Sequence, residues 1–450
     1  MIHVLDPQTV GQIAAGEIIE RPLSVVKELV ENSVDAGATR VRVTLEQGGI
    51  SLIEVGDDGS GIDPQDLALA VRRHATSKLS QAQDLESVAT LGFRGEGLAS
   101  IAAVSQLEIL SRVAESDVGA RVTAHAETAG PIEKAGAPVG TIVRARSLFE
   151  NVPVRREYLK SPATELARIS SWLSTFALGY PSVTFSLRND GKELWVMPAA
   201  PDERARLAMV FGKSAAETLI PIDGEAARSM HGTLWGFISS PGNDRGDRRM
   251  QILFVNGRLL RSTLLAGAWT AGYSTFAMTG RQPYGVLFLQ LPADHVDPNV
   301  HPTKSDVRLR YSHQVADTVK RTIAVTLRNH ASRRFGDAIT VSAAPESIDA
   351  SLAHLQTLFE RVPADDPSET GAQTGLRVLA QIDRTYILAT DGRALVLVDQ
   401  HAAHERIAYE RIVCAAGAAT PPAEPLLVPF VFELTGDRAG SLERVLEPLR

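Results

Sequence analysis

Stretches with a helical spacing of apolar residues alternate with short strand-like runs along residues 1–200. Between Gln12 and Val34, apolar side chains recur three and four positions apart, which predicts a helix. Apolar and polar residues alternate in Val41–Leu45, Ser51–Val55, Thr141–Ala145 and Val183–Leu187, which predicts strands. Because these elements form no repeated strand–helix–strand series, the pattern predicts an α+β fold.

A second block with the same mixture follows a stretch rich in Pro and Ala near residues 198–202. Strand-like runs at 232–238, 251–255 and 285–291 precede a stretch of helical spacing at 314–334. The change in composition predicts a boundary between a first domain, residues 1–200, and a second domain, residues 201–335.

The texture of the sequence changes after the second block. Residues 336–375 are poor in large apolar side chains and rich in Pro, Ser, Gly, Asp and Thr, which predicts a flexible linker. Residues 376–450 begin with three strand-like runs, RVLAQI, YILAT and ALVLVD. We expect this last block to be the first part of a third α+β domain.

Composition narrows the possible functions. The chain has 450 residues, a formal net charge of -7 and a single cysteine, Cys414. One cysteine excludes a disulfide framework, and the negative charge argues against a basic coat along the whole chain. The N-terminus lacks a signal-peptide pattern, and no apolar run reaches the roughly 20 residues needed to cross a bilayer. We therefore expect a cytoplasmic protein with no membrane partner.

The first candidate site lies in KELVENSVDAGA, residues 27–38. On a helix, Glu28 and Asn32 are four residues apart and share a face. A carboxylate can take a proton from water, and an amide oxygen can ligate Mg²⁺ without adding charge. The alternative is an ordinary solvated helix face.

Two glycine-containing motifs follow. VGDDGSGI, residues 55–62, places Asp57 and Gly61 directly after a strand, where the backbone can approach a planar ligand closely. The alternative is an ordinary acidic hairpin turn. Further along, Gly92, Gly95 and Gly97 precede the helix-like run LASIAAV. Glycines that open a helix expose N–H groups that favour phosphate. Their spacing matches neither the Walker A pattern nor the dinucleotide-binding fingerprint.

The order and spacing of these motifs resemble the GHKL ATPases, a superfamily that includes gyrase-type topoisomerases, Hsp90, sensor histidine kinases and MutL proteins. Within it, the chain closely resembles the MutL/HexB family of mismatch-repair proteins in QIAAGEIIERPLSVVKELVENSVDAGAT, RHATSK, LGFRGEGLASI, LFENVPVRREYLKS, FVNGR and VDPNVHPTKSDVR. The resemblance implies a GHKL (Bergerat) ATPase α/β sandwich in 1–200 and an S5-like transducer domain that contacts DNA in 201–335. It also implies a flexible linker in 336–375 and part of the MutL C-terminal dimerisation and endonuclease-type domain in 376–450.

The resemblance also assigns roles in an Mg-dependent ATPase. Glu28 would activate the attacking water, and Lys304 would reach the γ-phosphate. Asn32 would ligate Mg²⁺, and Asp57 would read the adenine amine. The other implied ATP-binding positions are Gly61, Thr76, Thr141 and the lid residues Gly92, Phe93, Arg94, Gly95, Glu96, Gly97 and Leu98, with Asp35, Ser77 and Lys78 as supporting positions.

A second metal site is incomplete in this sequence. DQHAAHERIAYE, residues 399–410, matches the MutL endonuclease pattern. Asp399, His401 and Glu405 are implied ligands for Mn²⁺ or Zn²⁺, and Glu410 fills the last motif position. The Cys-Pro-His-Gly-Arg-Pro segment that completes this site in nuclease-type relatives does not occur here. Glu424 stands where relatives begin a sliding-clamp-binding segment with Gln, which leaves clamp binding open.

The resemblance implies a dimeric, ATP-gated matchmaker that links mismatch recognition to strand removal. Its implied partners are a MutS-type protein, a second copy of the chain, and mismatched DNA bound without sequence readout. Candidate phosphate contacts are three basic clusters: Arg155, Arg156 and Lys160; Arg245, Arg248 and Arg249; and Arg258 and Arg261. The alternative is an ATP-regulated, metal-dependent strand-nicking endonuclease. Two other GHKL functions are disfavoured. A sensor kinase would need a phosphoacceptor helix before the ATPase block, and a topoisomerase would need a long cleavage region.

Overall fold

The computed structural model describes most of the first 337 residues and a small sheet further on. The described residues are 16, 18–76, 78, 90–92, 95–125, 128–222, 224, 227–229, 232–273, 276, 281–297, 308–337, 377–382, 386–390, 395–399 and 403. The chain forms two compact units, Met1–Ser332 and Arg333–Arg450.

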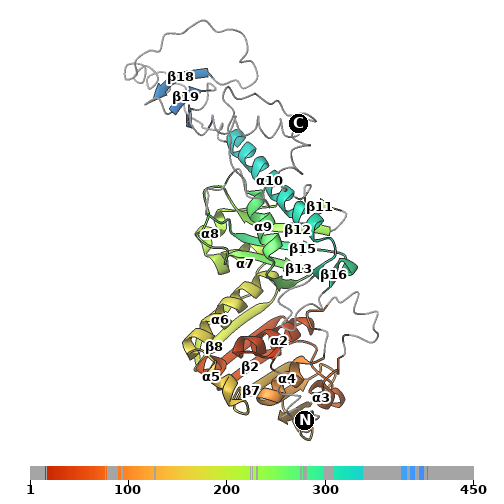
Figure 1. The fold of residues 1–450 in the computed structure, drawn as a ribbon. Helices are drawn as coiled ribbons and strands as arrows, with labels where there is room; N and C mark the ends of the chain where they lie inside the picture. Colours follow the sequence, from red (N-terminus) through yellow and green to blue (C-terminus); the bar gives the residue numbers. More distant parts are fainter. Residues whose placement is uncertain are drawn as a thin grey trace, which may run out of the picture. The chain divides into compact units, whose positions relative to one another are not determined.

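The first unit begins with a mixed sheet in the order β5-β4-β3-β7-β2-β1-β8-β9, with β6 beside β4 (Figure 1). Among the described strands of this sheet, β1 and β8 pair in parallel and the other pairs are antiparallel. This α+β topology agrees with the sequence pattern. The strands are β1 (Arg40–Glu46), β2 (Leu52–Asp57), β3 (Gln106–Arg112), β4 (Gly119–His125), β5 (Thr128–Ala129), β6 (Glu133–Ala135), β7 (Gly140–Arg146), β8 (Thr184–Asn189) and β9 (Lys192–Met197).

Helices cover one face of this sheet, where α6, α2 and α4 lie across β8, β2 and β7 (Figure 1). The apolar stripe of α2, including Val26 and Leu29, packs in one core with alternate strand residues such as Val43 and Ile53. Burial of each such side chain stabilises the fold by roughly 1.5–3 kcal/mol. The elements are α2 (Pro22–Asp35), α3 (Pro64–Ala70), α4 (Gly97–Val104), α5 (Pro153–Glu157), α6 (Pro162–Phe176) and the 3₁₀ turns η1 (Gln47–Gly49) and η3 (Ala177–Gly179).

The helix predicted over residues 12–34 is wrong in one respect. Ile19 and Glu20 are not helical, and α2 begins only at Pro22. Arg21 is extended, with φ -161° and ψ 171°, because a residue before proline is disfavoured in the α region. Proline fits the first position of a helix, since its missing N–H would have no partner there.

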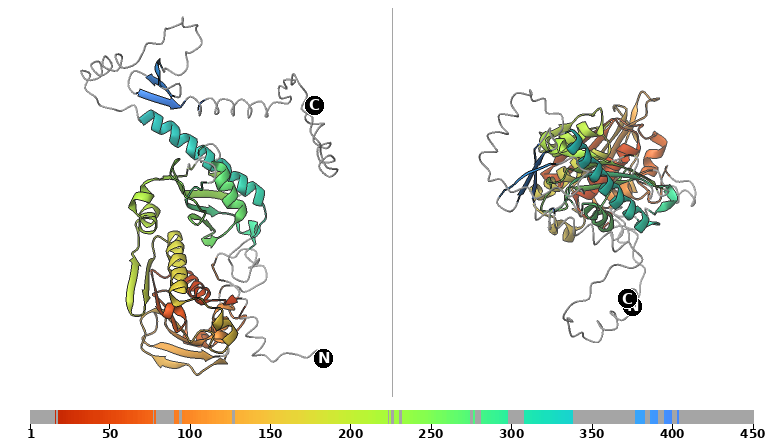
Figure 2. Two further views of the ribbon diagram at one scale, coloured as in Figure 1. Left: turned by 60° about the vertical axis from the view of Figure 1, so that its left-hand side comes forward. Right: turned by 90° about the horizontal axis from the view of Figure 1, so that it is seen from above.

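The second sheet in this unit, in the order β10-β12-β15-β13-β14 with β11 beside β12, has a core on each face. On one face α9 and α10 lie side by side, and Trp269 and Ile323 pack with Leu253 (Figures 1 and 2). On the other face, Leu207 of α7 packs with Phe254. The strands are β10 (Leu219–Pro221), β11 (Arg228–Ser229), β12 (Gly232–Ser239), β13 (Gln251–Val255), β14 (Arg258–Leu260) and β15 (Gly285–Gln290). The remaining elements are α7 (Glu203–Phe211), α8 (Lys213–Glu217), α9 (Thr263–Gly272), η4 (Ala293–His295), α10 (Ser312–Asp337) and a two-stranded pair, β16 (Val296–Asp297) with β17 (Arg308–Leu309).

A buried arginine joins the two sheets. Arg206 on α7 is 0% exposed and donates to the main-chain oxygens of Pro181, Val183 and Met197 at 2.9, 2.6 and 3.4 Å. Burial lowers the pKa of this guanidinium. The hydrogen bonds to these oxygens anchor α7 to the segment around β8 and β9, and so fix where the second sheet begins.

Apart from the last residues of α10 and Ala403, the described part of the second unit is a three-stranded antiparallel sheet of β18 (Arg377–Ile382), β19 (Tyr386–Thr390) and β20 (Leu395–Asp399). These strands are the three runs predicted from the sequence. Within the described ranges, no helix is both long and apolar enough to span a membrane.

Candidate functional site

Helix α2 places the first polar groups of the site. Its apolar stripe is buried against the sheet, and this turns Glu28, Asn32 and Asp35 toward a cavity beside the end of β2. Glu28 is 7% exposed, so its carboxylate is largely removed from bulk water. A carboxylate and an amide one helical turn apart therefore face the same space, as their spacing predicts.

Asp57 ends β2 and is held by three donors. Its Oδ2 accepts from Ser33 Oγ at 2.7 Å, and its Oδ1 accepts from the N–H groups of Gly59 and Thr141 at 3.0 and 3.2 Å. Burial raises the pKa of Asp57, while these hydrogen bonds oppose the shift. At Gly140, φ is +112° and a Cβ would lie 2.1 Å from Asp57 O, so only glycine allows β7 to start this close to β2.

The segment that carries Gly92, Gly95 and Gly97, called the glycine segment below, contacts α2 through main-chain groups. Asp35 accepts from the N–H groups of Leu91 and Gly92 at 2.8 and 2.9 Å. At Gly97, the first residue of α4, a Cβ would lie 2.8 Å from Glu28 Oε2. A side chain at position 97 would therefore displace the Glu28 carboxylate from its place beside the start of α4. The N–H groups at this helix start also favour an anion.

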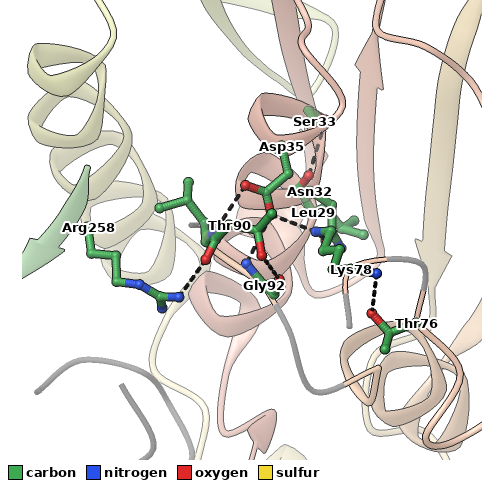
Figure 3. A network of polar contacts seen from close by, with 10 residues as sticks. Leu29, Asn32, Ser33, Asp35, Thr76, Lys78, Thr90, Gly92 and Arg258 are labelled. Carbon is green, nitrogen blue, oxygen red and sulfur yellow. Dashed lines mark hydrogen bonds and ion pairs between the residues drawn. The ribbon is translucent and has the colours of Figure 1, made fainter. Parts of the chain in front are cut away.

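Lys78 occupies the space between these groups (Figure 3). Its Nζ donates to Asn32 Oδ1 at 2.9 Å and to Asp35 Oδ2 at 2.6 Å. The amide oxygen expected to ligate Mg²⁺ is thus already held by an ammonium group. A metal ion at Asn32 would have to replace that contact.

One cavity of about 900 Å³ brings the predicted residues together. Its size is in the range of ordinary ligand sites. Carboxylates outnumber cations in its wall, since Lys78 is the single Lys or Arg among the described lining residues. A polyphosphate would bind there best as a metal complex. The predicted residues that line the cavity are Glu28, Asn32, Asp57, Gly61, Thr76, Gly92, Gly95, Glu96, Gly97, Leu98 and Thr141.

Two groups of lining residues are not predicted from the sequence. Ser33 donates a hydrogen bond to Asp57. The feature of the sequence that could have identified it is a serine inside the apolar stripe of α2. Ile62, Leu69 and Val143 line the cavity as apolar wall, and in sequence they resemble core residues. An apolar wall opposite a carboxylate suits a planar, partly polar ring.

The other predicted site residues fall elsewhere. Phe93, Arg94, Lys304, His401, Glu405 and Glu410 lie outside the described residues. Asp399 is exposed at the end of β20. Within the described ranges, no group of three His, Cys, Asp or Glu side chains is placed to hold a metal ion.

The structure changes one of the basic clusters. Arg258, grouped with Arg261 as a phosphate contact, is 8% exposed, and its Nη2 donates to Thr90 O at 2.5 Å. Its guanidinium therefore belongs to the interior next to the glycine segment. Arg261 is exposed.

Three family models match successive parts of the chain. Residues 20–135 match histidine kinase-, DNA gyrase B- and HSP90-like ATPases. Residues 207–328 match the C-terminal domain of DNA mismatch repair protein, and residues 379–450 match the MutL C-terminal dimerisation domain.

Relatives align with the whole chain. DNA mismatch repair protein MutL of Anaeromyxobacter dehalogenans (strain 2CP-C) is 37% identical over 493 aligned residues, which cover 100% of this chain and 81% of that protein. MutL of Trichlorobacter lovleyi is 36% identical over 480, covering 100% and 80%. A crystal structure of the N-terminal domain of a DNA repair protein superposes with a TM-score of 0.61 at 26% identity, covering 71% of this chain and 98% of that domain.

The fold and the site define a nucleotide-binding ATPase of the histidine kinase, gyrase B and HSP90 class. Both sheets and the cavity lie within the region matched by the mismatch-repair models and relatives. The chain belongs to the MutL family of DNA mismatch repair proteins. It is a DNA mismatch repair ATPase, which confirms the resemblance drawn from its six sequence blocks.

Proposed function

We propose that the cavity binds Mg-ATP with Asp57 at the adenine and Glu28 at the terminal phosphate. The observation that carries this proposal is that Glu28 and Asn32 share one face of α2 and line one cavity with Asp57. Asp57 accepts from the adenine amine, and Asn32 Oδ1, which here accepts from Lys78, would hold Mg²⁺ beside the phosphates. Glu28 takes the proton of the attacking water. Gly61, Thr76 and Thr141 line the pocket around the nucleotide.

The remaining roles rest on motif matches. Gly92–Leu98, with Phe93 and Arg94, forms the lid over the phosphates, and Lys304 supplies a cation to the γ-phosphate. The domains extend over residues 1–200, 201–335 and 376–450, with a linker at 336–375. These boundaries follow the change in composition, and each domain contains one of the matched models.

The protein acts as an ATP-gated matchmaker in this proposal. The match to a dimerisation domain at residues 379–450 supports a homodimer, and ATP binding closes the two N-terminal regions around DNA. A MutS-type protein on mismatched DNA is the upstream partner. DNA is held through phosphates without sequence readout, so initial binding weakens with salt. The protein would then work in the cytoplasm, at the nucleoid.

Closure predicts that nucleotide controls how long the protein stays on DNA. With the non-hydrolysable analogue AMP-PNP and Mg²⁺, we expect retention on circular DNA after a high-salt wash, because a closed ring resists salt better than phosphate contacts do. ADP should not give retention, and linearising the DNA should release the protein. Pull-down on immobilised circular and cut DNA measures both. Equal retention with AMP-PNP and ADP would refute ATP-gated closure.

Nicking is the second candidate function, favoured by the Asp399 motif. If residues 399–410 hold Mn²⁺ or Zn²⁺, the chain should nick supercoiled plasmid in Mn²⁺, and Asp399→Asn should abolish nicking while ATP hydrolysis continues. The assay compares the parent with this variant on an agarose gel. Nicking by the parent alone supports the nuclease. Supercoiled plasmid left intact by both proteins contradicts it.

A further inference from the structure

Arg258 reaches the glycine segment from the second sheet. Asn256 and Gly257 have positive φ angles of 48° and 79°, and Val255 pairs with Arg258 across them. This is the geometry of a two-residue hairpin turn of type I′, which Asn-Gly favours. The turn fixes the first residue of β14, and from there the guanidinium donates to Thr90 O at 2.5 Å.

Helix α2 also binds this segment, through Asp35. Asp35 binds the N–H groups of Leu91 and Gly92, directly after the carbonyl of Thr90 that Arg258 binds. Figure 3 shows this chain of contacts running from Asn32 and Lys78 through Asp35 and Thr90 to Arg258. Three consecutive residues, 90–92, are thus held through main-chain groups by a carboxylate from one sheet's helix and a guanidinium from the other sheet.

Arg258 is a charged side chain that is almost fully buried, which opposes its charged form unless other groups compensate the charge. Burial lowers the pKa of this guanidinium, and the carboxylates of Glu31, Asp35 and Glu28 oppose the shift. Removing one member of a group of buried opposite charges is destabilising, so one effect of Arg258 is to compensate these carboxylates. Its hydrogen bond to Thr90 O is a second contact, which reaches the glycine segment from the second sheet.

We propose that Arg258 is a positioning residue that couples the lid to the second sheet. It holds Thr90, and with it Leu91 and Gly92 at the start of the proposed lid, so that a change at these residues on nucleotide binding is passed to the β13–β14 hairpin. Because Arg258 contacts Thr90 rather than the reacting atoms, it acts on catalysis through the lid. This inference rests on the proposed role of the lid.

The test compares Arg258→Met and Arg258→Lys with the exposed Arg228→Met on β11 as a matched control. For Arg258→Met we expect kcat for ATP to fall about tenfold, the effect of one lost hydrogen bond to a charged group. The KM for ATP and the affinity for ADP should stay within about twofold, because adenine contacts Asp57 and not the lid. Arg258→Lys should recover part of kcat, and Arg228→Met should match the parent.

Hydrogen exchange supplies a readout that a purely structural role would not change. In the parent, AMP-PNP should slow exchange in residues 251–260, and in Arg258→Met this response should disappear although the analogue still binds. A normal response and normal kcat in Arg258→Met would overturn the coupling. The coupling would also be overturned if Arg258→Met lowered both the unfolding temperature and the affinity for ADP, and Arg258→Lys restored neither. A parent that shows no response to AMP-PNP would instead overturn the proposed role of the lid.

Discussion

Replacing Glu28 by glutamine is expected to leave ATP bound but to remove most of its hydrolysis. Glutamine has nearly the same shape, so it fills the place beside Gly97 without opening a cavity, but it cannot accept a proton from water. General-base catalysis contributes about 10²–10⁴-fold, so kcat should fall at least about 100-fold. Single-turnover hydrolysis and equilibrium binding of ATP measure the two effects separately.

Two comparisons make the Glu28 result specific. Glu46→Gln alters an exposed carboxylate on β1, away from the cavity, and should hydrolyse ATP like the parent. Asn32→Ala should instead weaken binding of Mg-ATP itself, since it removes the proposed metal ligand. Hydrolysis by Glu28→Gln at the rate of the parent would show that another group activates the water.

Replacing Asp57 by asparagine should weaken ATP binding by about 10–100-fold, the loss expected for one hydrogen bond to a charged group. The remaining oxygen can still accept from Gly59 and Thr141, and the Ser33 hydroxyl can turn to accept from the new amide. The fold is therefore kept, but a donor now faces the adenine amine. Guanine presents an acceptor at that position, so discrimination against GTP should also decrease. Calorimetric titration with ATP and GTP measures both.

The neighbouring aspartate provides the control for Asp57. Asp58 is exposed, and its carboxylate binds Thr39 and the N–H of Arg40 rather than facing the cavity. Asp58→Asn keeps an acceptor for both N–H groups and should bind ATP like the parent. If Asp57→Asn and Asp58→Asn bind ATP equally well, the adenine contact has been assigned to the wrong residue.

Local spacing was sufficient to predict much of the site. Glu28 and Asn32 follow from helical periodicity, and Asp57 follows from its place after a strand. The start of α2 could be refined by the rule for residues before proline, which excludes a continuous helix through Arg21. Helices α6 and α9 carry a signal that the apolar pattern does not use, because Ser161 and Ser262 cap them by accepting from the N–H groups of Thr164 and Leu265.

Contacts between distant segments could not be predicted in the same way. Arg258 and Thr90 are 168 positions apart, and nothing in FVNGR indicates that its arginine turns inward. Its place in a local basic cluster with Arg261 suggested a surface role for Arg258, whereas burial and a main-chain acceptor place it inside. Ser33 is similar, since its partner Asp57 is fixed only when β2 and α2 pack together.

The way Arg206 binds the first sheet bears on how freely the family can diverge. Its acceptors are the carbonyl oxygens of residues 181, 183 and 197, which any amino acid presents. The side chains of these residues can therefore differ between this chain and a relative that is only 37% identical to it, without loss of the hydrogen bonds from Arg206. A chimera that exchanges residues 181–197 for those of a relative would keep the attachment as long as the backbone keeps its course and position 206 remains an arginine.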